Sequence, residues 1–224
     1  MRFESLLPVQ AAVERGELPS RMFRRIRGRE PELGLAIDRI ERASGIPYPP
    51  YYVEPSITVA TGADMGVSLL YCRTLPLADE QGLSILVSMS APFLLYASRG
   101  TLQAVLAHEL LHYLEFVRRF SSLRLENLPS ASTSFEAPFA DMDAALPAHL
   151  VFKDRGLVRL IARKFRPYLV DEALAKKVWT LWVEKGYPVR RIQMAENYLR
   201  IPIASILRAS FDQKVLNLLS RIYS

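Results

Sequence analysis

The sequence predicts an α+β fold, because helical patterns and strand patterns occupy separate stretches of the chain. Helical periodicity dominates both ends of the chain, whereas segments rich in β-branched and aromatic residues lie between them. No repeat of fixed period points to a solenoid. Half of the 224 residues are apolar and 23% are charged, as in proteins with a packed core. We therefore expect a small, mostly antiparallel sheet packed against helices.

The first 45 residues predict three helices, at residues 8–15, 20–27 and 31–43. Pro31 stands in the first turn of the third helix, where a missing backbone N–H removes no hydrogen bond. The apolar faces of these helices are short, so we expect the helices to pack on another element.

A proline-rich turn at residues 47–50 separates these helices from three segments with strand composition. The three predicted strands are residues 51–60, 67–73 and 83–90. After the third strand, residues 102–119 predict a strongly apolar helix. Ser98 and Thr101 are both candidate N-caps for it, because their side-chain oxygens can accept a hydrogen bond from the first helical turn.

The rest of the chain predicts helices up to its end. They are expected at residues 135–146, 156–164, 170–184 and 189–198, with two more segments within 203–223. Residues 151–224 hold 15 Lys and Arg against 6 Asp and Glu, net +9, whereas residues 1–150 hold 14 against 17, net −3. A charge excess of this size is usually a solvated face, so we do not expect a nucleic-acid partner.

The single cysteine, Cys72, cannot form an intramolecular disulfide, which fits a reducing compartment. Residues 1–16 lack the basic and then apolar layout of a signal peptide. The longest apolar stretch, residues 85–97, is shorter than the roughly 18 residues that a membrane span needs. These features predict a cytoplasmic protein without a transmembrane segment. They give no oligomeric state.

A metal motif lies in the predicted helix at residues 102–119. Residues 108–112 read His-Glu-Leu-Leu-His. On a helix, residues four apart share one face, so the imidazoles of His108 and His112 can bind one cation. Glu109 lies at the edge of the same face, where it can accept a proton from a zinc-bound water. A buried polar triplet without partners would be costly, which favours a zinc site over two core histidines.

Residues 105–114, VLAHELLHYL, resemble the signature of zincin metallopeptidases, including its uncharged positions around the histidines. The resemblance implies a zinc hydrolase that cleaves a peptide or protein substrate, with Glu109 as the general base. It also implies an edge strand beside the substrate cleft that pairs with an extended substrate, for which residues 83–90 are the candidate. The glycine and third histidine of metzincins are replaced by Glu115 and Arg118, so the chain is not of metzincin type.

A catalytic zinc takes three protein ligands and a water, so a third ligand must lie elsewhere. Residues 135–147 resemble the glutamate helix of gluzincins such as the HtpX-like and ImmA/IrrE-like peptidases, which makes Glu136 the first candidate. Ala140 replaces the aspartate of the family pattern. Asp143, Asp141 and His149 stay open as alternative ligands or as groups that support a zinc-bound histidine.

Taken together, these patterns assign residues 1–150 to a zincin-like catalytic domain and residues 151–224 to a basic helical region packed on it. Two other functions are compatible with the sequence. A regulatory or vestigial protein would bind zinc without turnover, and a basic nucleic-acid-binding protein would use residues 151–224 and bind more weakly as salt rises.

Overall fold

The computed structural model describes residues 5–62, 66–79, 82–123, 133–138, 144–166, 169–193 and 198–223. The fold is α+β, as predicted. The three predicted N-terminal helices are confirmed as α1 (Leu7–Glu14), α2 (Ser20–Arg27) and α3 (Glu30–Ser44). Helix α3 ends at Gly45, whose φ of 77° is the left-handed conformation that glycine adopts without strain.

Sheet A has the strand order β1 (Tyr51–Glu54), β5 (Gly82–Ser90) and β4 (Cys72–Asp79). Strand β5 runs parallel to β1 and antiparallel to β4. The predicted strand at residues 83–90 is therefore confirmed, but its expected place at the edge is wrong, because β5 is the central strand. Its nearly continuous run of buried residues follows from packing on both faces.

Sheet B joins β3 (Gly66–Leu70), β2 (Ile57–Gly62) and β7 (Val189–Gln193). Strand β2 is antiparallel to β3 and parallel to β7. The predicted strand at residues 51–60 is thus two strands, divided at Pro55, where no backbone N–H can continue a ladder.

Sheet C consists of β6 (Ser134–Pro138) and β8 (Tyr198–Pro202), paired antiparallel. The helices predicted at residues 135–146 and 189–198 are therefore wrong over their described parts, which hold β6, β7 and the start of β8. The expectation of a mostly antiparallel sheet is also corrected, because the small sheets mix parallel and antiparallel pairs. Residues 151–224 are basic but not wholly helical, since β7 and β8 pair with strands of residues 1–150.

Helix α5 (Arg99–Ser121) contains the motif and is the longest helix of the described residues. It follows the short helix α4 (Ala91–Tyr96). The Ser98 side chain accepts a hydrogen bond from the Thr101 backbone N–H, which confirms Ser98 as the N-cap. The Thr101 hydroxyl in turn donates to Asp171 at 2.6 Å, so the start of α5 is fixed to the chain before α9 (Glu172–Val178).

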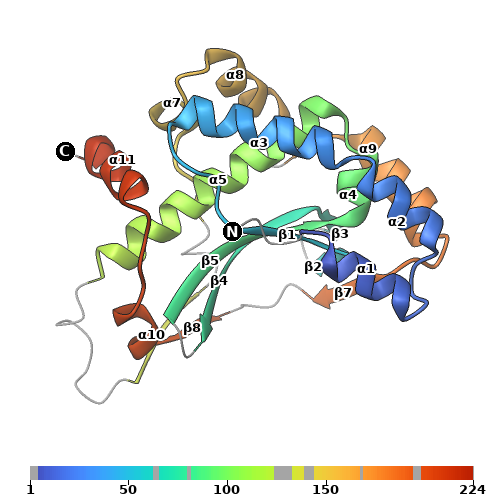
Figure 1. Cartoon of the computed structure of the whole chain (residues 1–224), viewed down its shortest axis with the longest axis horizontal. Helices are drawn as coiled ribbons and strands as arrows, with labels where there is room; N and C mark the ends of the chain where they lie inside the picture. The colour runs from blue at the N-terminus through green and yellow to red at the C-terminus, as the bar shows by residue number, and fades with distance from the viewer. Residues whose placement is uncertain are drawn as a thin grey trace.

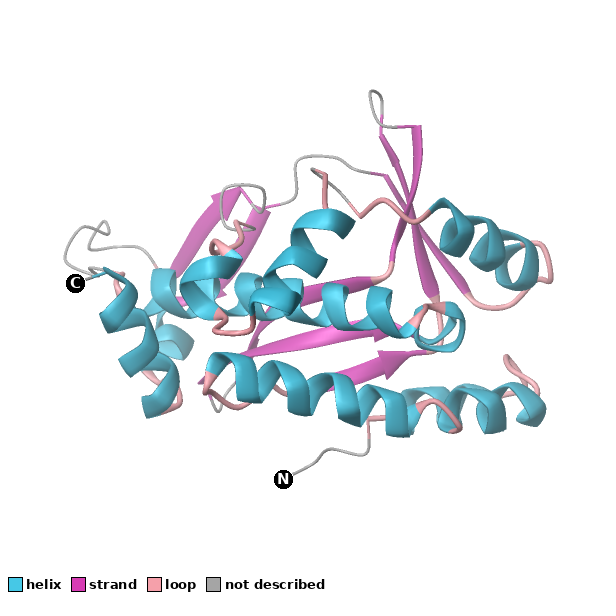
Figure 2. Ribbon diagram, turned by 90° about the horizontal axis from the view of Figure 1, so that it is seen from above, coloured by secondary structure: helices cyan, strands magenta, loops and turns pink. Residues whose placement is uncertain are grey.

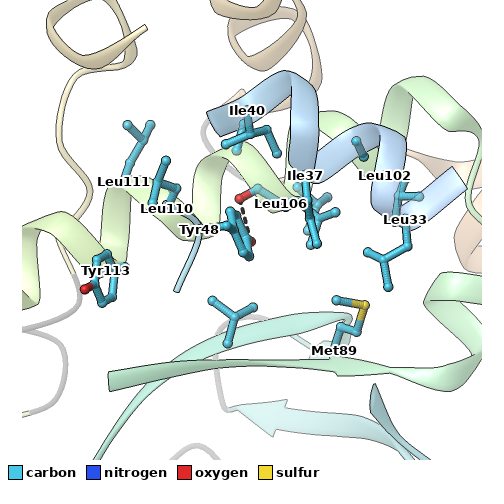
Figure 3. Packing of buried hydrophobic residues seen from close by; sticks show 14 of the residues in the cluster. Leu33, Ile37, Ile40, Tyr48, Met89, Leu102, Leu106, Leu110, Leu111 and Tyr113 are labelled. Atoms are coloured by element: carbon cyan, nitrogen blue, oxygen red, sulfur yellow. Dashed lines mark hydrogen bonds between the residues drawn. The ribbon is translucent and has the colours of Figure 1, made fainter. Parts of the chain in front are cut away.

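The core lies between sheet A and the helices α3 and α5, which cover it (Figures 1 and 2). Figure 3 shows Leu33 and Ile37 of α3, Leu106 of α5 and Met89 of β5 converging in this layer. The Tyr48 hydroxyl donates to the Leu106 carbonyl oxygen at 2.9 Å, so the one polar atom of this ring has a partner. Sheet A and both helices thereby share one dry interior.

The C-terminal half adds helices around α5. They are α7 (Ala148–Val151), α8 (Arg155–Lys164), α9 with the π-helix η2 (Trp179–Val183), α10 (Ile203–Leu207) and α11 (Gln213–Tyr223). Helices α7 and α8 contact α5, and Figure 1 places them beyond α3 and α5 as seen from sheet A. Among the described residues, no helix is both long and apolar enough to span a bilayer.

Glu115 shows how α5 keeps a carboxylate inside the protein. Its side chain is 6% exposed and accepts hydrogen bonds from Arg118 and Arg119 at 2.6 to 2.8 Å. Burial acts to raise the pKa of Glu115, but the two guanidinium groups outweigh it and hold the pKa below its ordinary value. The ionised form of Glu115 is therefore favoured more strongly in the folded than in the unfolded chain.

We expect Glu115→Gln to lower the free energy of unfolding at pH 7 by about 1.5 to 3 kcal/mol, because charge-assisted hydrogen bonds are lost. The folded-state pKa is depressed, so the native contribution is present above the unfolded value and disappears as pH falls below about 4. Urea denaturation of the wild-type protein and the variant, at pH 7 and at a pH below about 4, measures the difference in their free energy of unfolding. The exposed Glu184→Gln serves as the control, and an equal loss at both pH values would contradict the assignment.

Candidate metal and catalytic site

His108 and His112 lie on one face of α5 with their rings turned toward each other. The two Nε2 atoms are 3.1 Å apart, and the ring centroids are 4.6 Å apart. Both residues are half-buried, in contrast to the buried apolar residues of α5 around them. The i, i+4 spacing therefore produces the convergence of imidazole nitrogens that the sequence predicted.

The backbone of the segment before α7 orients one of the imidazoles. His112 Nδ1 lies 3.2 Å from the Ala144 carbonyl oxygen. A carbonyl oxygen can only accept, so this contact favours the tautomer with a proton on Nδ1. The lone pair of His112 Nε2 then points toward His108, in the position from which a metal would be bound.

His108 lies deeper in the protein and packs on an aromatic ring. Its imidazole stacks on Phe165, which follows α8 directly, with ring centroids 4.0 Å apart. Burial, and then the nearby His112, lower the pKa of His108 to about 3. The imidazole is accordingly neutral at physiological pH, which is the form that binds metal ions.

Glu109 is buried on the sheet side of α5. Its carboxylate accepts a hydrogen bond from the Thr74 hydroxyl at 2.8 Å, and the Glu109 carbonyl oxygen lies 3.1 Å from the same hydroxyl. Thr74 belongs to β4, one of the two outer strands of sheet A among the described residues. The carboxylate therefore lies where α5 meets the edge of the sheet, one residue from the first histidine.

Glu136, the first candidate for a third ligand, lies elsewhere. It is on β6 rather than on a helix, and its carboxylate accepts a hydrogen bond from Arg200 of β8 at 2.6 Å. The two residues are direct partners in the antiparallel ladder. The structure thus gives Glu136 a cross-strand ion pair and does not bring it to the histidines.

The other candidates are distributed differently. His149 is on α7 and exposed. Asp141 and Asp143 lie outside the described residues. Within the part of the chain that the structure describes, no three His, Cys, Asp or Glu side chains form a group able to hold a metal ion. Among the described residues, the candidate site therefore consists of two converging imidazoles and one carboxylate that contacts Thr74.

Three partners of the site had no signal in the sequence. Thr74, Phe165 and Ala144 are 35, 57 and 32 residues from the motif residues that they contact. Each is of an ordinary residue type in an ordinary local pattern, so only the folded chain reveals its contact.

The chain matches no protein-family model, no curated protein and no solved structure.

Removal of the Thr74 hydroxyl should uncouple Glu109 from the sheet. In a double-mutant cycle of Thr74→Val and Glu109→Gln, we expect a coupling energy of about 1.5 to 3 kcal/mol, as for a hydrogen bond to a charged group. Urea denaturation at pH 7 measures it, and Thr74→Ser is the control that keeps the donor. Effects that add to within about 0.5 kcal/mol would show that the contact is not made.

Proposed function

We propose that the protein is a zinc-dependent hydrolase of zincin type that cleaves peptide bonds. The observation that carries the proposal is the 3.1 Å separation of His108 Nε2 and His112 Nε2 on one face of α5. Two nitrogens bound to one tetrahedral zinc at about 2.0 to 2.1 Å lie roughly 3.3 Å apart. The pair therefore fits a shared zinc with little movement of either ring.

The donor set also fits zinc chemically. Both imidazoles are half-buried, and the Ala144 carbonyl favours the tautomer of His112 that carries its proton on Nδ1 and its lone pair on Nε2. Without a metal, the same two nitrogens can only share one hydrogen bond between neutral rings. When bound, zinc would supply a water of lowered pKa and a Lewis acid for a carbonyl oxygen.

Glu109 is the proposed general base. A carboxylate oxygen takes a proton from the attacking water and later delivers it to the leaving amine. The Thr74 hydroxyl, 2.8 Å away, fixes the orientation of the carboxylate before substrate binds. This orientation limits the base to the side of α5 that faces sheet A.

A peptide substrate is supported by the position of β4. Among the described strands, β4 is one of the two outer strands of sheet A, and it is the one whose Thr74 contacts the proposed base. An extended peptide beside such a strand gains main-chain hydrogen bonds and comes to lie close to Glu109. Strand β4 thereby takes the function expected of residues 83–90, which form the central strand instead.

The third ligand remains a prediction. Asp143 directly precedes Ala144 in the sequence, and the Ala144 carbonyl lies 3.2 Å from His112 Nδ1. We therefore prefer Asp143 over Asp141 as the carboxylate ligand.

Zinc binding separates these assignments. We expect about one zinc per chain by elemental analysis of the tag-free protein, as a single tetrahedral site requires. His108→Ala and His112→Ala should lose the metal, and Asp143→Ala should weaken its binding by more than about 100-fold. Glu136→Ala should retain it, because that carboxylate is paired with Arg200.

The exposed His149→Ala is the matched control for loss of a histidine and should also retain zinc. Absence of zinc from the wild-type protein after incubation with an excess of the metal would refute the proposed function. Loss of zinc in Glu136→Ala would restore the original ligand assignment and contradict the position of Glu136 on β6.

Hydrolysis tests the general base. Glu109→Gln should retain zinc and lower the cleavage of a fluorogenic peptide library by about 10²- to 10⁴-fold, the usual contribution of a positioned base. Zinc content is measured on the same samples, so loss of the base is distinguished from loss of the metal. A wild-type protein that binds zinc and cleaves none of the library would favour the regulatory alternative.

A further inference from the structure

Helix α8 has a row of arginines on its solvent face. Arg155, Arg159 and Arg163 follow one another at intervals of four residues, and all three are exposed. Leu157 and Ile161 of the same helix are buried on the opposite side. Because residues four apart on a helix are neighbours, the three guanidinium groups form one continuous basic stripe.

The stripe carries three positive charges at close spacing. Among the described residues, no carboxylate lies within ion-pair distance of these three arginines. The two aspartates that flank α8 are engaged elsewhere, Asp154 with Arg39 at 2.8 Å and Asp171 with Lys164 at 2.9 Å. Like charges at this spacing disfavour the helix. The stripe is therefore a charge excess that an anionic partner would stabilise.

The stripe ends at the candidate site. Phe165, two residues after Arg163, stacks on His108 with ring centroids 4.0 Å apart. Arg166 follows it and is also exposed. Helix α8 packs along α5, and Phe165 follows directly after α8, so the Arg163 end of the stripe is the end nearer to His108. An extended ligand that contacts Arg155 first and Arg163 last arrives beside the imidazole pair.

We propose that α8 binds an acidic segment of the polypeptide substrate and directs the adjoining peptide bond to the histidine pair, an inference that rests on the proposed function. Arginines four residues apart on a helix are separated by about 6 Å along its axis. Alternate residues of an extended peptide are separated by about 6.6 to 6.8 Å. The stripe thus matches glutamates or aspartates at every second position of the substrate.

The observations favour a peptide over a nucleic acid. The stripe is one side chain wide, and residues 1–150, which form the rest of the site, have a net charge of −3. Nucleic-acid-binding surfaces combine a broader basic field with aromatic side chains on which bases stack. The stripe recognises a peptide by single carboxylates at a fixed spacing, each of which forms charge-assisted hydrogen bonds with a guanidinium group.

Binding is measured by fluorescence anisotropy on the full-length Glu109→Gln variant with zinc, so that the probe is not cleaved. The probe is a labelled peptide of about ten residues, which extends to roughly 33 Å and is longer than α8. Half of it carries glutamates at alternate positions, and a matched peptide carries glutamines instead. We expect the glutamate peptide to bind about 30-fold more tightly, from about threefold for each of three exposed charge pairs.

Arg159→Glu with Arg163→Glu should abolish this preference. The matched control is Arg21→Glu with Arg24→Glu on α2, which changes the net charge equally on a helix that packs against α1 and α4, and it should keep the preference. If the reversed α8 variant does not fold by circular dichroism, the glutamine pair at the same two positions replaces it. Equal binding of both peptides, or the same loss in both variants, overturns the proposal.

A single-stranded oligonucleotide of equal charge is tested alongside. If the oligonucleotide binds more tightly than the glutamate peptide, and if the α8 variant loses this binding, the stripe binds nucleic acid and the proposal is wrong. Zinc content, measured separately, distinguishes failure of the proposed hydrolase from failure of the proposed acidic-segment surface. Glutamate preference without zinc refutes the hydrolase and retains the acidic-segment surface, whereas zinc without glutamate preference refutes only that surface.

Discussion

The burial of helix α5 is the constraint on which the rest of the structure depends. Most of its side chains are enclosed by sheet A, α3 and the C-terminal helices. The polar groups on it need partners inside the protein, because burying them alone is unfavourable. Thr74 meets Glu109, two arginines meet Glu115, and the two histidines meet each other. Thr74 therefore ties sheet A to α5, whereas the other polar groups named here are paired within the helix itself.

The same constraint directs neighbouring side chains of the motif to different elements. Glu109 is directed to the edge of sheet A, where an extended chain can be added. His108 is directed to the end of α8, where Phe165 packs on its ring. A rigid helix keeps the base and the metal-binding nitrogens at a fixed separation, which a loop could not do as accurately. Hydrolysis by an activated water needs this fixed relation.

Residues 133–138 and 189–202 show where prediction from the sequence failed. Short segments of mixed apolar and polar residues fit a helix or a strand about equally well, so local pattern does not decide between them. Strand β6 exists because it pairs with β8, and Glu136 meets Arg200 across 64 residues of chain. Strand β7 likewise depends on β2. Such long-range pairings leave no local signal in the sequence. This is why the residues of β6 were expected to form the glutamate helix.

The sequence by itself determined the N-terminal helices, the apolar motif helix with Ser98 and Thr101 as its two candidate caps, and the shared face of His108 and His112. Each follows from interactions within a few residues, which periodicity and capping describe fully. Only the tertiary structure decided that β5 is central, that Thr74 meets Glu109, and that Glu136 lies away from the histidines. These depend on contacts between distant segments, whose free energy comes from burial and pairing rather than from local preference.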